Sequence, residues 1–296
     1  MMTDRSTLRR LMAEKETVIT CGCGDAISAK IINEVDGFDG VLSSGFTLAA
    51  MAMGLPDAEL YSRSDNVYAV SNMCYVLDKP LIADIDTAYG NAVTTIKTVN
   101  DFERAGASGV VIEDQISPKR CPICVTDLNT TISAEEAAGK IRAAAENRLY
   151  KDTLIIARTD ITNVEERNRR AQMYLEAGAD LVQGISKSYT ASGNMVENIK
   201  QFVDAMDGRV SLVVCGGLDS LTRKDIEYIK PKICHFALVP INYMYPALRK
   251  AIEFVGENHE QAGIPLEKAN HSELVKFLGM SKIGAQEKKY IPQIDC

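Results

Sequence analysis

Eight short apolar runs alternate with amphipathic stretches along this chain, and this alternation constrains the fold more than any other feature. The runs are rich in Val and Ile and contain few polar residues, which is typical of parallel strands covered on both faces. They lie at residues 17–21, 40–44, 81–86, 109–113, 153–158, 180–185, 210–215 and 233–239. Eight strand–helix units in one direction predict an α/β fold, a (β/α)8 barrel of the TIM type.

An open, doubly wound sheet is the main alternative to a barrel. Such sheets usually contain a glycine-rich phosphate-binding turn after a strand. The segment Cys21-Gly-Cys-Gly24 is only weakly similar to that turn, because it lacks the third glycine. The sequence therefore favours a catalytic barrel, which we predict for residues 1–262, followed by a helical tail at 263–296 that packs on the barrel or on a neighbouring subunit.

Charge and cysteine content limit the partners and the compartment. The net charge is -7 and the pI is near 5.2. Because no basic run offsets the acids, we expect neither a nucleic acid nor a membrane as a partner. No apolar stretch approaches the roughly 20 residues of a membrane span, and the N-terminus lacks the apolar core of a signal peptide. The eight cysteines are scattered, which favours reduced thiols and a cytoplasmic location.

Polar residues gather where the apolar runs end. Parallel strands of a barrel present their carboxyl ends at one rim, and barrel active sites are built at that rim. This placement predicts an enzyme. The residues are Ser43, Ser44, Asp84, Asp86, Glu113, Arg158, Asp160 and Ser186.

Three of these acids predict a metal site. Asp84 and Asp86 are two residues apart, so on a strand they would project to the same side, and Glu113 ends the next apolar run. Carboxylate oxygens suit Mg²⁺, with Mn²⁺ as a second choice. The alternative is that acids at strand ends face water or cap the following helix.

Arg158 has a planar guanidinium that suits a substrate carboxylate, although it could instead be a structural partner of Asp160 or Glu113. The chain has only three histidines. Acid–base chemistry is therefore expected to fall to carboxylates, a thiol or metal-bound water.

The segment from residue 115 to 125 has the length and charge of a lid. Cys121 follows Lys119 and Arg120, and adjacent cations lower the pKa of a thiol, making it a better nucleophile or proton donor. Cys121 and Cys124 could also form a redox pair or be incidental. A zinc knuckle would need a second ligand pair, and none is evident.

Several segments together resemble the phosphoenolpyruvate mutase/isocitrate lyase superfamily, from about Leu8 to the end of the chain. The resemblance implies an α/β barrel with a swapped eighth helix and a homo-oligomer, either a tetramer or a dimer. The segments that carry it are Gly24-Asp-Ala-Ile-Ser-Ala-Lys, Leu42-Ser-Ser-Gly, Gly54-Leu-Pro-Asp57, Asp84-Ile-Asp-Thr-Ala-Tyr-Gly, Ile112-Glu-Asp-Gln, Pro118-Lys-Arg-Cys and Ile156-Ala-Arg-Thr-Asp.

The same resemblance implies roles for individual residues. Asp84 would bind Mg²⁺ directly, with Asp86 and Glu113 holding it through water. Three catalytic residues are implied, Cys121, Lys119 and Asp57. Cys121 and Lys119 match the gating loop, where the lyase cysteine returns a proton to the enolate left by C–C cleavage. The remaining matches are Asp57, beside the reacting group, and four substrate-binding residues, Ser44, Gly45, Arg158 and Ser186.

Three departures from the lyase pattern leave the reaction open. Pro122 and Ile123 replace the Gly-His of the lyase loop, Cys215-Gly-Gly217 does not match the usual asparagine-containing segment, and Gly184-Ile-Ser-Lys187 replaces a Pro-Glu pair. The last segment is closer to the phosphonate-processing branch, whereas the tail at 277–290 looks like that of lyases acting on short malate-type acids.

Three hypotheses follow from this pattern. The first is a Mg²⁺-dependent C–C lyase acting on a short 2-hydroxy or 2-oxo di- or tricarboxylic acid. The second is a mutase or hydrolase acting on a phosphorus–carbon bond, such as that of phosphonopyruvate. The third is a non-catalytic barrel that binds a small acid or a partner.

Overall fold

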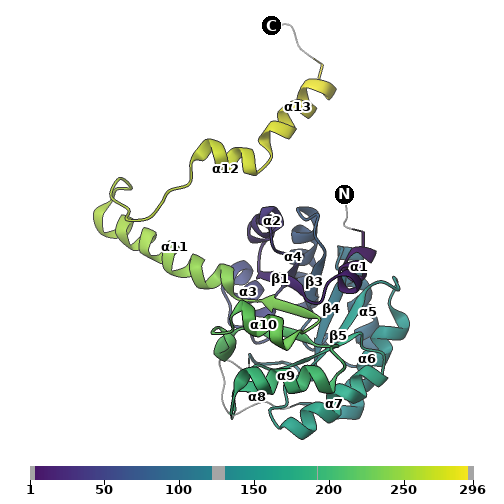
Figure 1. Ribbon diagram of the computed structural model, residues 1–296. Helices are drawn as coiled ribbons and strands as arrows, with labels where there is room; N and C mark the ends of the chain where they lie inside the picture. Colours follow the sequence, from purple (N-terminus) through teal and green to yellow (C-terminus); the bar gives the residue numbers. More distant parts are fainter. Residues whose placement is uncertain (1–3, 122–130, 192, 293–296) are drawn as a thin grey trace. The chain divides into compact units, whose positions relative to one another are not determined.

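The computed structural model describes residues 4–121, 131–191 and 193–292, and its central feature is a barrel of eight parallel strands (Figure 1). The strands pair in the order β6-β5-β4-β3-β2-β1-β8-β7, and a single parallel bridge between Val182 and Val210 links the two end strands. The prediction of a (β/α)8 barrel is confirmed, and the alternative of an open, doubly wound sheet is wrong. The strands are β1 Val18–Cys23, β2 Gly40–Ser43, β3 Leu81–Asp84, β4 Gly109–Glu113, β5 Leu154–Thr159, β6 Leu181–Gly184, β7 Ser211–Val214 and β8 Ile233–Phe236.

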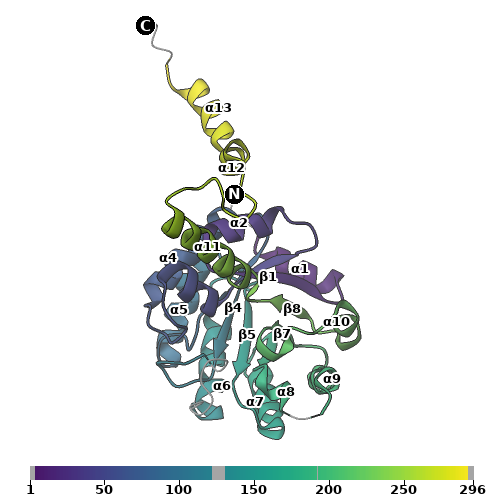
Figure 2. The same ribbon diagram turned by 90° about the vertical axis from the view of Figure 1, so that its left-hand side faces the viewer.

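Helices surround these strands, as the second view makes clear (Figure 2). Local signals set their ends: the Asn91 side chain accepts hydrogen bonds from Val93 N and Thr94 N at the start of α5, and Gly106 ends that helix in the left-handed region at φ 109°. The helices up to residue 242 include α1 Ser6–Glu14, α2 Ala26–Glu34, α3 Gly45–Leu48, α4 Arg63–Tyr75, α5 Ala92–Ala105, α6 Ala134–Asn147, α7 Val164–Glu176, α8 Lys187–Thr190, α9 Met195–Ala205 and α10 Arg223–Ile229, with a π-helical turn at Ala49–Met53 and a 3-10 turn at Gly216–Leu218.

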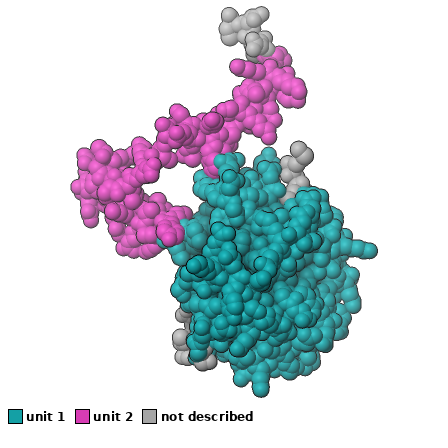
Figure 3. All heavy atoms as spheres, viewed as in Figure 1, with its two compact units in different colours: residues 1–242 teal, residues 243–296 magenta. Residues whose placement is uncertain are grey.

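The chain divides into two compact units, residues 1–242 and residues 243–296 (Figure 3). The first unit contains the barrel. The remaining helices are α11 Val239–Asn258, α12 His271–Phe277 and α13 Met280–Tyr290, and none of their residues is buried. The predicted division into a barrel at 1–262 and a tail at 263–296 stays a prediction. No helix of the described residues is long and apolar enough to cross a membrane.

Strand residues alternate between two hydrophobic clusters, which is the pattern of strands that face a barrel interior on one side and helices on the other. The interior cluster includes Leu42, Ile82, Val111 and Ile156, and the cluster shared with the helices includes Val41, Ala83, Val110 and Ile155. Asp84, Glu113 and Arg158 follow the interior residues of β3, β4 and β5 by two positions. The interior is therefore apolar in its middle and polar at its carboxyl end.

Gly22 and Gly24 lie where the backbone of β1 and the residue after it pack closely against other backbone segments. A Cβ at Gly22 would lie 2.0 Å from the carbonyl oxygen of Ala237, and one at Gly24 would lie 2.1 Å from that of Thr47. Only glycine fits so near another backbone. The Cys21-Gly-Cys-Gly24 segment is therefore explained by the contacts that β1 makes, with no phosphate turn required.

His235 of β8 is buried inside the barrel within a small polar network. One ring nitrogen meets the hydroxyl of Thr20 on β1, and the other lies 2.9 Å from Ser211 Oγ on β7. Burial lowers the pKa of His235 to about 3. The neutral imidazole is thus the form that the folded protein keeps.

Acidification should destabilise the barrel through His235. The unfolded state takes up the proton below its ordinary pKa of about 6.5, whereas the folded state does so only near 3, so stability falls as the pH drops below 6.5. Between pH 7 and pH 5 the loss should reach about 2 kcal/mol, at about 1.36 kcal/mol for each pH unit below 6.5. Urea unfolding at both pH values measures it.

His235→Asn is the matched variant, because it cannot take up the proton. It should lose less stability than the native protein over the same pH interval, even if it is less stable at pH 7. An equal loss in the two proteins would assign the acid sensitivity to other groups.

Candidate active site

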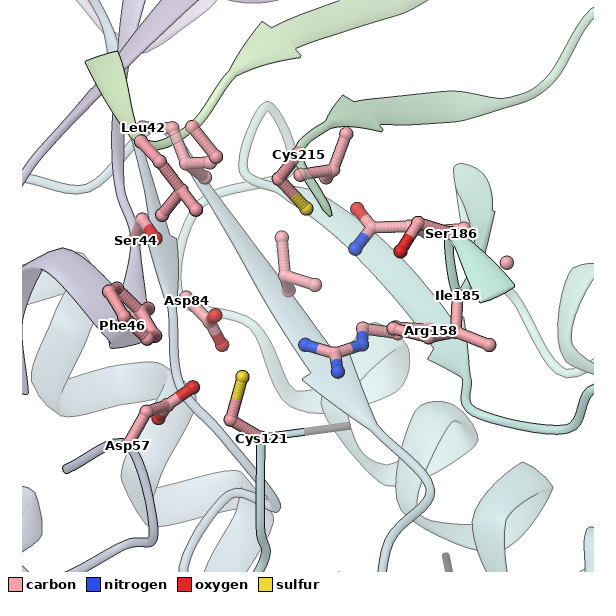
Figure 4. Close-up of a pocket in the computed structure, with 16 residues that line it drawn as sticks. Leu42, Ser44, Phe46, Asp57, Asp84, Cys121, Arg158, Ile185, Ser186 and Cys215 are labelled. Atoms are coloured by element: carbon pink, nitrogen blue, oxygen red, sulfur yellow. The ribbon is translucent and has the colours of Figure 1, made fainter. Parts of the chain in front are cut away.

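The rim residues surround a cavity at the carboxyl end of the barrel, with a volume of about 60 Å³ (Figure 4). Of the sequence-predicted residues, Ser44, Asp57, Asp84, Cys121, Arg158 and Ser186 line it directly. Four others contact these residues without lining the cavity: Gly45, Asp86, Glu113 and Lys119. Ser43 does not line the cavity either. The full lining is Leu42, Ser44, Phe46, Asp57, Asp84, Val111, Cys121, Arg158, Gln183, Gly184, Ile185, Ser186, Val213, Cys215, Ala237 and Leu238.

Asp84 and Asp86 are neighbours, but strand alternation is not the reason. β3 ends at Asp84, and Asp86 lies beyond it with φ 52°, in the left-handed region. Ala88 and Tyr89 also have positive φ values, of 61° and 57°. Such residues cost about 1–3 kcal/mol each and persist where surrounding contacts hold them. The prediction of a shared side along one strand was therefore wrong in its physical basis.

Hydrogen bonds hold both carboxylates in place. Asp84 accepts from Gly45 N at 3.3 Å and from Asp86 N at 3.1 Å. Asp86 Oδ2 accepts from the hydroxyls of Tyr61 at 2.8 Å and Tyr89 at 3.0 Å. A Cβ at Gly45 would lie only 3.1 Å from an oxygen of each carboxylate, so this position favours glycine.

Lys119 reaches into the acid cluster from the loop after β4. Its Nζ lies 2.6 Å from Asp57 Oδ1 and 2.9 Å from Asp86 Oδ1, and its side chain is 1% exposed. Burial disfavours the charged amine, but Asp86, Glu113 and Asp57 outweigh burial and raise its pKa well above the ordinary value. Lys119 is therefore a buried cation that joins the loop to two carboxylates.

Arg158 on β5 has two acidic partners. Its Nε and Nη2 donate to the two oxygens of Asp160 at 2.7 and 2.9 Å, and Nη1 lies 2.9 Å from Glu113 Oε2. Burial disfavours this cation, but Asp160 and Glu113 raise its pKa well above the ordinary value. The structural pairing considered from sequence is thus present. Since a guanidinium has five N–H donors, two remain for a ligand in the cavity.

The acids outnumber the cations in this region. Among the described residues, five carboxylates, those of Asp57, Asp84, Asp86, Glu113 and Asp160, accompany the cations Lys119 and Arg158, with Lys140 on the far side of Glu113. Burial, followed by Asp86, raises the pKa of Asp84, and burial raises that of Glu113 well above its ordinary value. The buried Oε1 of Glu113 accepts no hydrogen bond from any described residue. An excess of hard, buried oxygen donors fits a divalent cation.

The described residues contain no group of three or more His, Cys, Asp or Glu side chains positioned to bind one metal ion together. The assignment of Asp84, Asp86 and Glu113 to a metal site therefore stays a prediction. One direct carboxylate ligand with further acids acting through water fits this spacing, and Mg²⁺ commonly keeps several of its waters.

Cys121 lines the cavity and is 6% exposed. Its backbone N–H donates to Asp57 O at 2.9 Å, which fixes this end of the loop beside the acid cluster. The adjacent Lys119 directs its amine to Asp57 and Asp86. Cys124, and with it the predicted Cys121–Cys124 pair, lies outside the described residues, as do Pro122 and Ile123.

Sequence reasoning missed Glu59, which joins three segments. Its Oε1 accepts from the hydroxyl of Thr87, and its Oε2 accepts from Ser117 Oγ at 2.6 Å and Lys119 N at 3.1 Å. Tyr61, Tyr89, Gln183 and Cys215 were also missed. Two of these had a readable signal, because Cys215 ends the predicted strand 210–215 and Gln183 lies within the predicted strand 180–185. Glu59 had none.

Glu59→Ala should loosen the start of the loop that carries Lys119 and Cys121. A hydrogen bond to a charged acceptor contributes about 1.5–3 kcal/mol, so exchange of the Lys119 amide hydrogen should accelerate about tenfold or more. Hydrogen exchange followed by mass spectrometry measures this. Glu59→Gln keeps one acceptor oxygen and should show a smaller effect. Unchanged exchange in the alanine variant would contradict the role.

Comparison with known proteins identifies the family. The profile described as phosphoenolpyruvate phosphomutase matches residues 8–255. The chain belongs to this family, within the phosphoenolpyruvate mutase/isocitrate lyase superfamily. The resemblance found from the sequence is thus confirmed, and so is the prediction of an enzyme of this superfamily.

Individual relatives cover nearly the whole chain. It is 30% identical to 2,3-dimethylmalate lyase of Eubacterium barkeri, over 98% of this chain and 99% of the relative. It is 31% identical to phosphonopyruvate hydrolase of Variovorax sp. (strain Pal2), over 98% of this chain and 100% of that protein. A solved structure of phosphonopyruvate hydrolase with oxalate and Mg²⁺ superposes with a TM-score of 0.85 at 28% identity, covering 98% of this chain and 100% of that one.

Proposed function

We propose that this protein is a Mg²⁺-dependent carbon–carbon lyase that acts on a short 2-hydroxy or 2-oxo carboxylic acid. The observation that carries the proposal is one cavity whose lining combines the thiol of Cys121, the carboxylate of Asp84 and the guanidinium of Arg158. A proton donor, a metal ligand and a carboxylate-binding cation are the groups that such a cleavage needs. Similarity to 2,3-dimethylmalate lyase supports the same reaction class.

Each residue has a defined task in this proposal. Asp84 would hold Mg²⁺ directly, with Asp86 and Glu113 binding its waters; the ion supplies polarisation of a substrate carbonyl when bound. Ser44 and Gly45 would bind the oxo-acid end, and the two spare N–H groups of Arg158 would bind a carboxylate. Lys119 and Asp57 keep the loop against the site.

Proton transfer by Cys121 would complete the reaction. The hydroxyl of a 2-hydroxy acid would give its proton to a base, for which the Asp57 carboxylate at the cavity is the candidate. The carbon that carries this oxygen becomes a carbonyl as the carbon–carbon bond breaks, and the electron pair of that bond stays on the other fragment as an enolate. The Cys121 thiol gives its proton to the enolate carbon, and the resulting thiolate is reprotonated from solvent when the products leave. Ser186, at the edge of the cavity, would contact the substrate.

The test is an NMR turnover screen with Mg²⁺ across methylisocitrate, dimethylmalate, oxaloacetate, other malates and phosphonopyruvate. We expect cleavage of one short malate-type acid and loss of turnover on chelation with EDTA. Cys121→Ser should lower the rate at least about a hundredfold, since a positioned general acid contributes about 10²–10⁴-fold. Cys74→Ser, on α4 outside the cavity, is the matched control. Full activity of Cys121→Ser would contradict the proposed role of Cys121 as proton donor.

Cleavage of a phosphorus–carbon bond is the second candidate. Similarity to phosphonopyruvate hydrolase and the Ser186-Lys187 pair favour it. Phosphorus NMR with phosphonopyruvate distinguishes the two reactions, because only this candidate releases a new phosphorus species.

We also propose a homo-oligomer, either a dimer or a tetramer, with exchange of the eighth helix, in the cytoplasm. Helices α11, α12 and α13 have no buried residue, and they expose large apolar side chains that water does not favour. Sedimentation equilibrium is the test, and a monomer at micromolar concentration would contradict it. The side chains are Tyr243, Tyr245, Leu248, Ile252, Leu278, Met280, Ile283 and Tyr290.

A further inference from the structure

Four polar side chains stand in one part of the barrel interior. Thr20 on β1, His235 on β8 and Ser211 on β7 are 0% exposed, and Gln183 on β6 is 6% exposed. Barrel interiors are usually filled by bulky apolar side chains, and a buried polar group is unfavourable unless it is hydrogen-bonded. A polar path across four strands is therefore unusual, and its last member, Gln183, lines the cavity.

Hydrogen bonds join these four residues in a single chain. The Nδ1 atom of His235 meets Thr20 Oγ1, and its Nε2 atom lies 2.9 Å from Ser211 Oγ. Ser211 Oγ in turn lies 3.3 Å from the amide oxygen of Gln183. Both partners of the imidazole are hydroxyls, and burial lowers its pKa to about 3, so at neutral pH the ring carries a single N–H.

The number of protons fixes the direction of this chain. If the proton of His235 were on Nδ1, that N–H would donate to Thr20, and Ser211 would donate to Nε2. The amide NH2 group of Gln183 would then have to donate to Ser211. The Thr20 hydroxyl would be left as a buried donor without an acceptor, because it has no other hydrogen-bond partner among the described residues. Such an unpaired buried donor is unfavourable.

The opposite direction leaves no donor of the chain unpaired. Thr20 donates to Nδ1 of His235, the Nε2–H group donates to Ser211, and Ser211 donates to the amide oxygen of Gln183. The amide NH2 group is then turned away from Ser211 and donates to no described residue. Because Gln183 lines the cavity, these N–H groups are available to a ligand there.

Arg158 lies beside Gln183 in the sheet. The two residues are partners in the parallel register of β5 and β6, and both line the cavity. Arg158 has two N–H groups that Glu113 and Asp160 do not use. The amide NH2 group adds uncharged donors next to them. Charged and neutral donors on one side of a cavity suit the oxygen atoms of a carboxylate.

We infer that Gln183 is a further substrate-binding residue, whose amide NH2 group donates to a carboxylate oxygen of the substrate beside Arg158. Thr20, His235 and Ser211 are positioning residues, because they hold the amide in this orientation without touching the substrate. The ligand in this inference rests on the proposed function, whereas the orientation of the amide follows from the hydrogen-bond chain alone.

Nitrogen NMR of the full-length protein tests the direction of the chain without any ligand. The ¹⁵N shifts of an imidazole distinguish a protonated from an unprotonated nitrogen. His259 and His271 are exposed, so replacing both by glutamine leaves His235 as the one histidine of the chain. We expect the proton on Nε2 at neutral pH. A proton on Nδ1 would overturn the inference, because the amide oxygen would then face the cavity, and it would leave the lyase proposal standing.

Calorimetric titration with malate in the presence of Mg²⁺ tests the contact with the ligand. Gln183→Met keeps the length of the side chain and removes both N–H groups. We expect malate to bind this variant about tenfold to a hundredfold more weakly, the range for a hydrogen bond to a charged acceptor. Gln183→Glu presents a carboxylate oxygen in place of the NH2 group and should weaken binding further. Unchanged affinity in the methionine variant, folded by circular dichroism, would overturn the inference.

Ser211→Ala separates positioning from packing. It removes the contact with the amide oxygen, so the amide can turn either way and malate should bind about twofold more weakly. Added to Gln183→Met, it should cause no further loss, since no amide remains to be oriented. An equal loss in both backgrounds would contradict the positioning role. Failure of the native protein to bind malate and pyruvate would contradict the proposed function, and the tautomer of His235 would still determine the orientation of the amide.

Discussion

Asp84→Asn is expected to abolish Mg²⁺-dependent turnover and, in the metal-free protein, to raise the melting temperature. In the proposed mechanism Asp84 is the one direct ligand of the metal. A metal ion contributes several kcal/mol to transition-state stabilisation, and each 1.36 kcal/mol is a factor of ten, so the rate should fall by about 10³-fold or more. Steady-state kinetics measures the loss of turnover, and a Mg²⁺ titration measures the accompanying loss of metal binding.

The gain in stability follows from the charges around Asp84. Five carboxylates surround Lys119 and Arg158. Asp84 is hydrogen-bonded to the N–H groups of Gly45 and Asp86 and forms no ion pair with a described residue. The asparagine oxygen can still accept one of these hydrogen bonds, while the substitution removes a charge that repels its neighbours. The melting temperature should therefore rise, by about 2–4 °C for each kcal/mol gained.

Asp180→Asn is the matched control. Asp180 pairs with Arg9 and Arg148, away from the cavity, so its loss should lower stability and leave turnover unchanged. If Asp84→Asn instead keeps its activity with Mg²⁺, the metal is not held as we propose. A lower melting temperature would show that Asp84 stabilises the fold.

The barrel and its functional rim could be predicted from the sequence because each parallel strand appears there as a short apolar run that ends in polar residues. Runs such as 109–113 end in an acid after apolar residues, and every parallel strand ends at the same rim. Two positions along a strand return to the same face, so Val111 and Glu113 both lie on the interior side. Local periodicity was sufficient to place Asp84, Glu113 and Arg158 at one rim.

The contacts among these residues could not be predicted in the same way. Asp86 has a left-handed backbone, and its carboxylate accepts a hydrogen bond from Tyr61, which is distant in the sequence. The insertion of Lys119 between Asp57 and Asp86 joins two loops that have no periodic pattern. Such contacts depend on tertiary structure, and single residues in loops give no repeating signal from which to infer them.

Arg158→Met should destabilise the barrel more than any other single change at this rim. Arg158 is the partner of both Glu113 and Asp160, and all three side chains are buried. Removing one member of a buried ion pair costs about 3–5 kcal/mol, because the remaining charge stays unpaired. The melting temperature should fall by about 6–20 °C, at about 2–4 °C per kcal/mol. Arg158→Lys keeps the charge but loses the two-pronged contact with Asp160, so its effect should be intermediate.

A triple variant separates the unpaired charges from the loss of packing. Adding Glu113→Gln and Asp160→Asn to Arg158→Met removes both carboxylates that the methionine leaves without a cation. If unpaired charge causes the destabilisation, the triple variant should recover more than half of the lost melting temperature by calorimetry, although it remains inactive. No recovery would mean that Arg158 acts mainly through its contacts with the barrel interior. The same cation also faces the cavity, so this experiment determines how far barrel stability depends on a residue of the candidate active site.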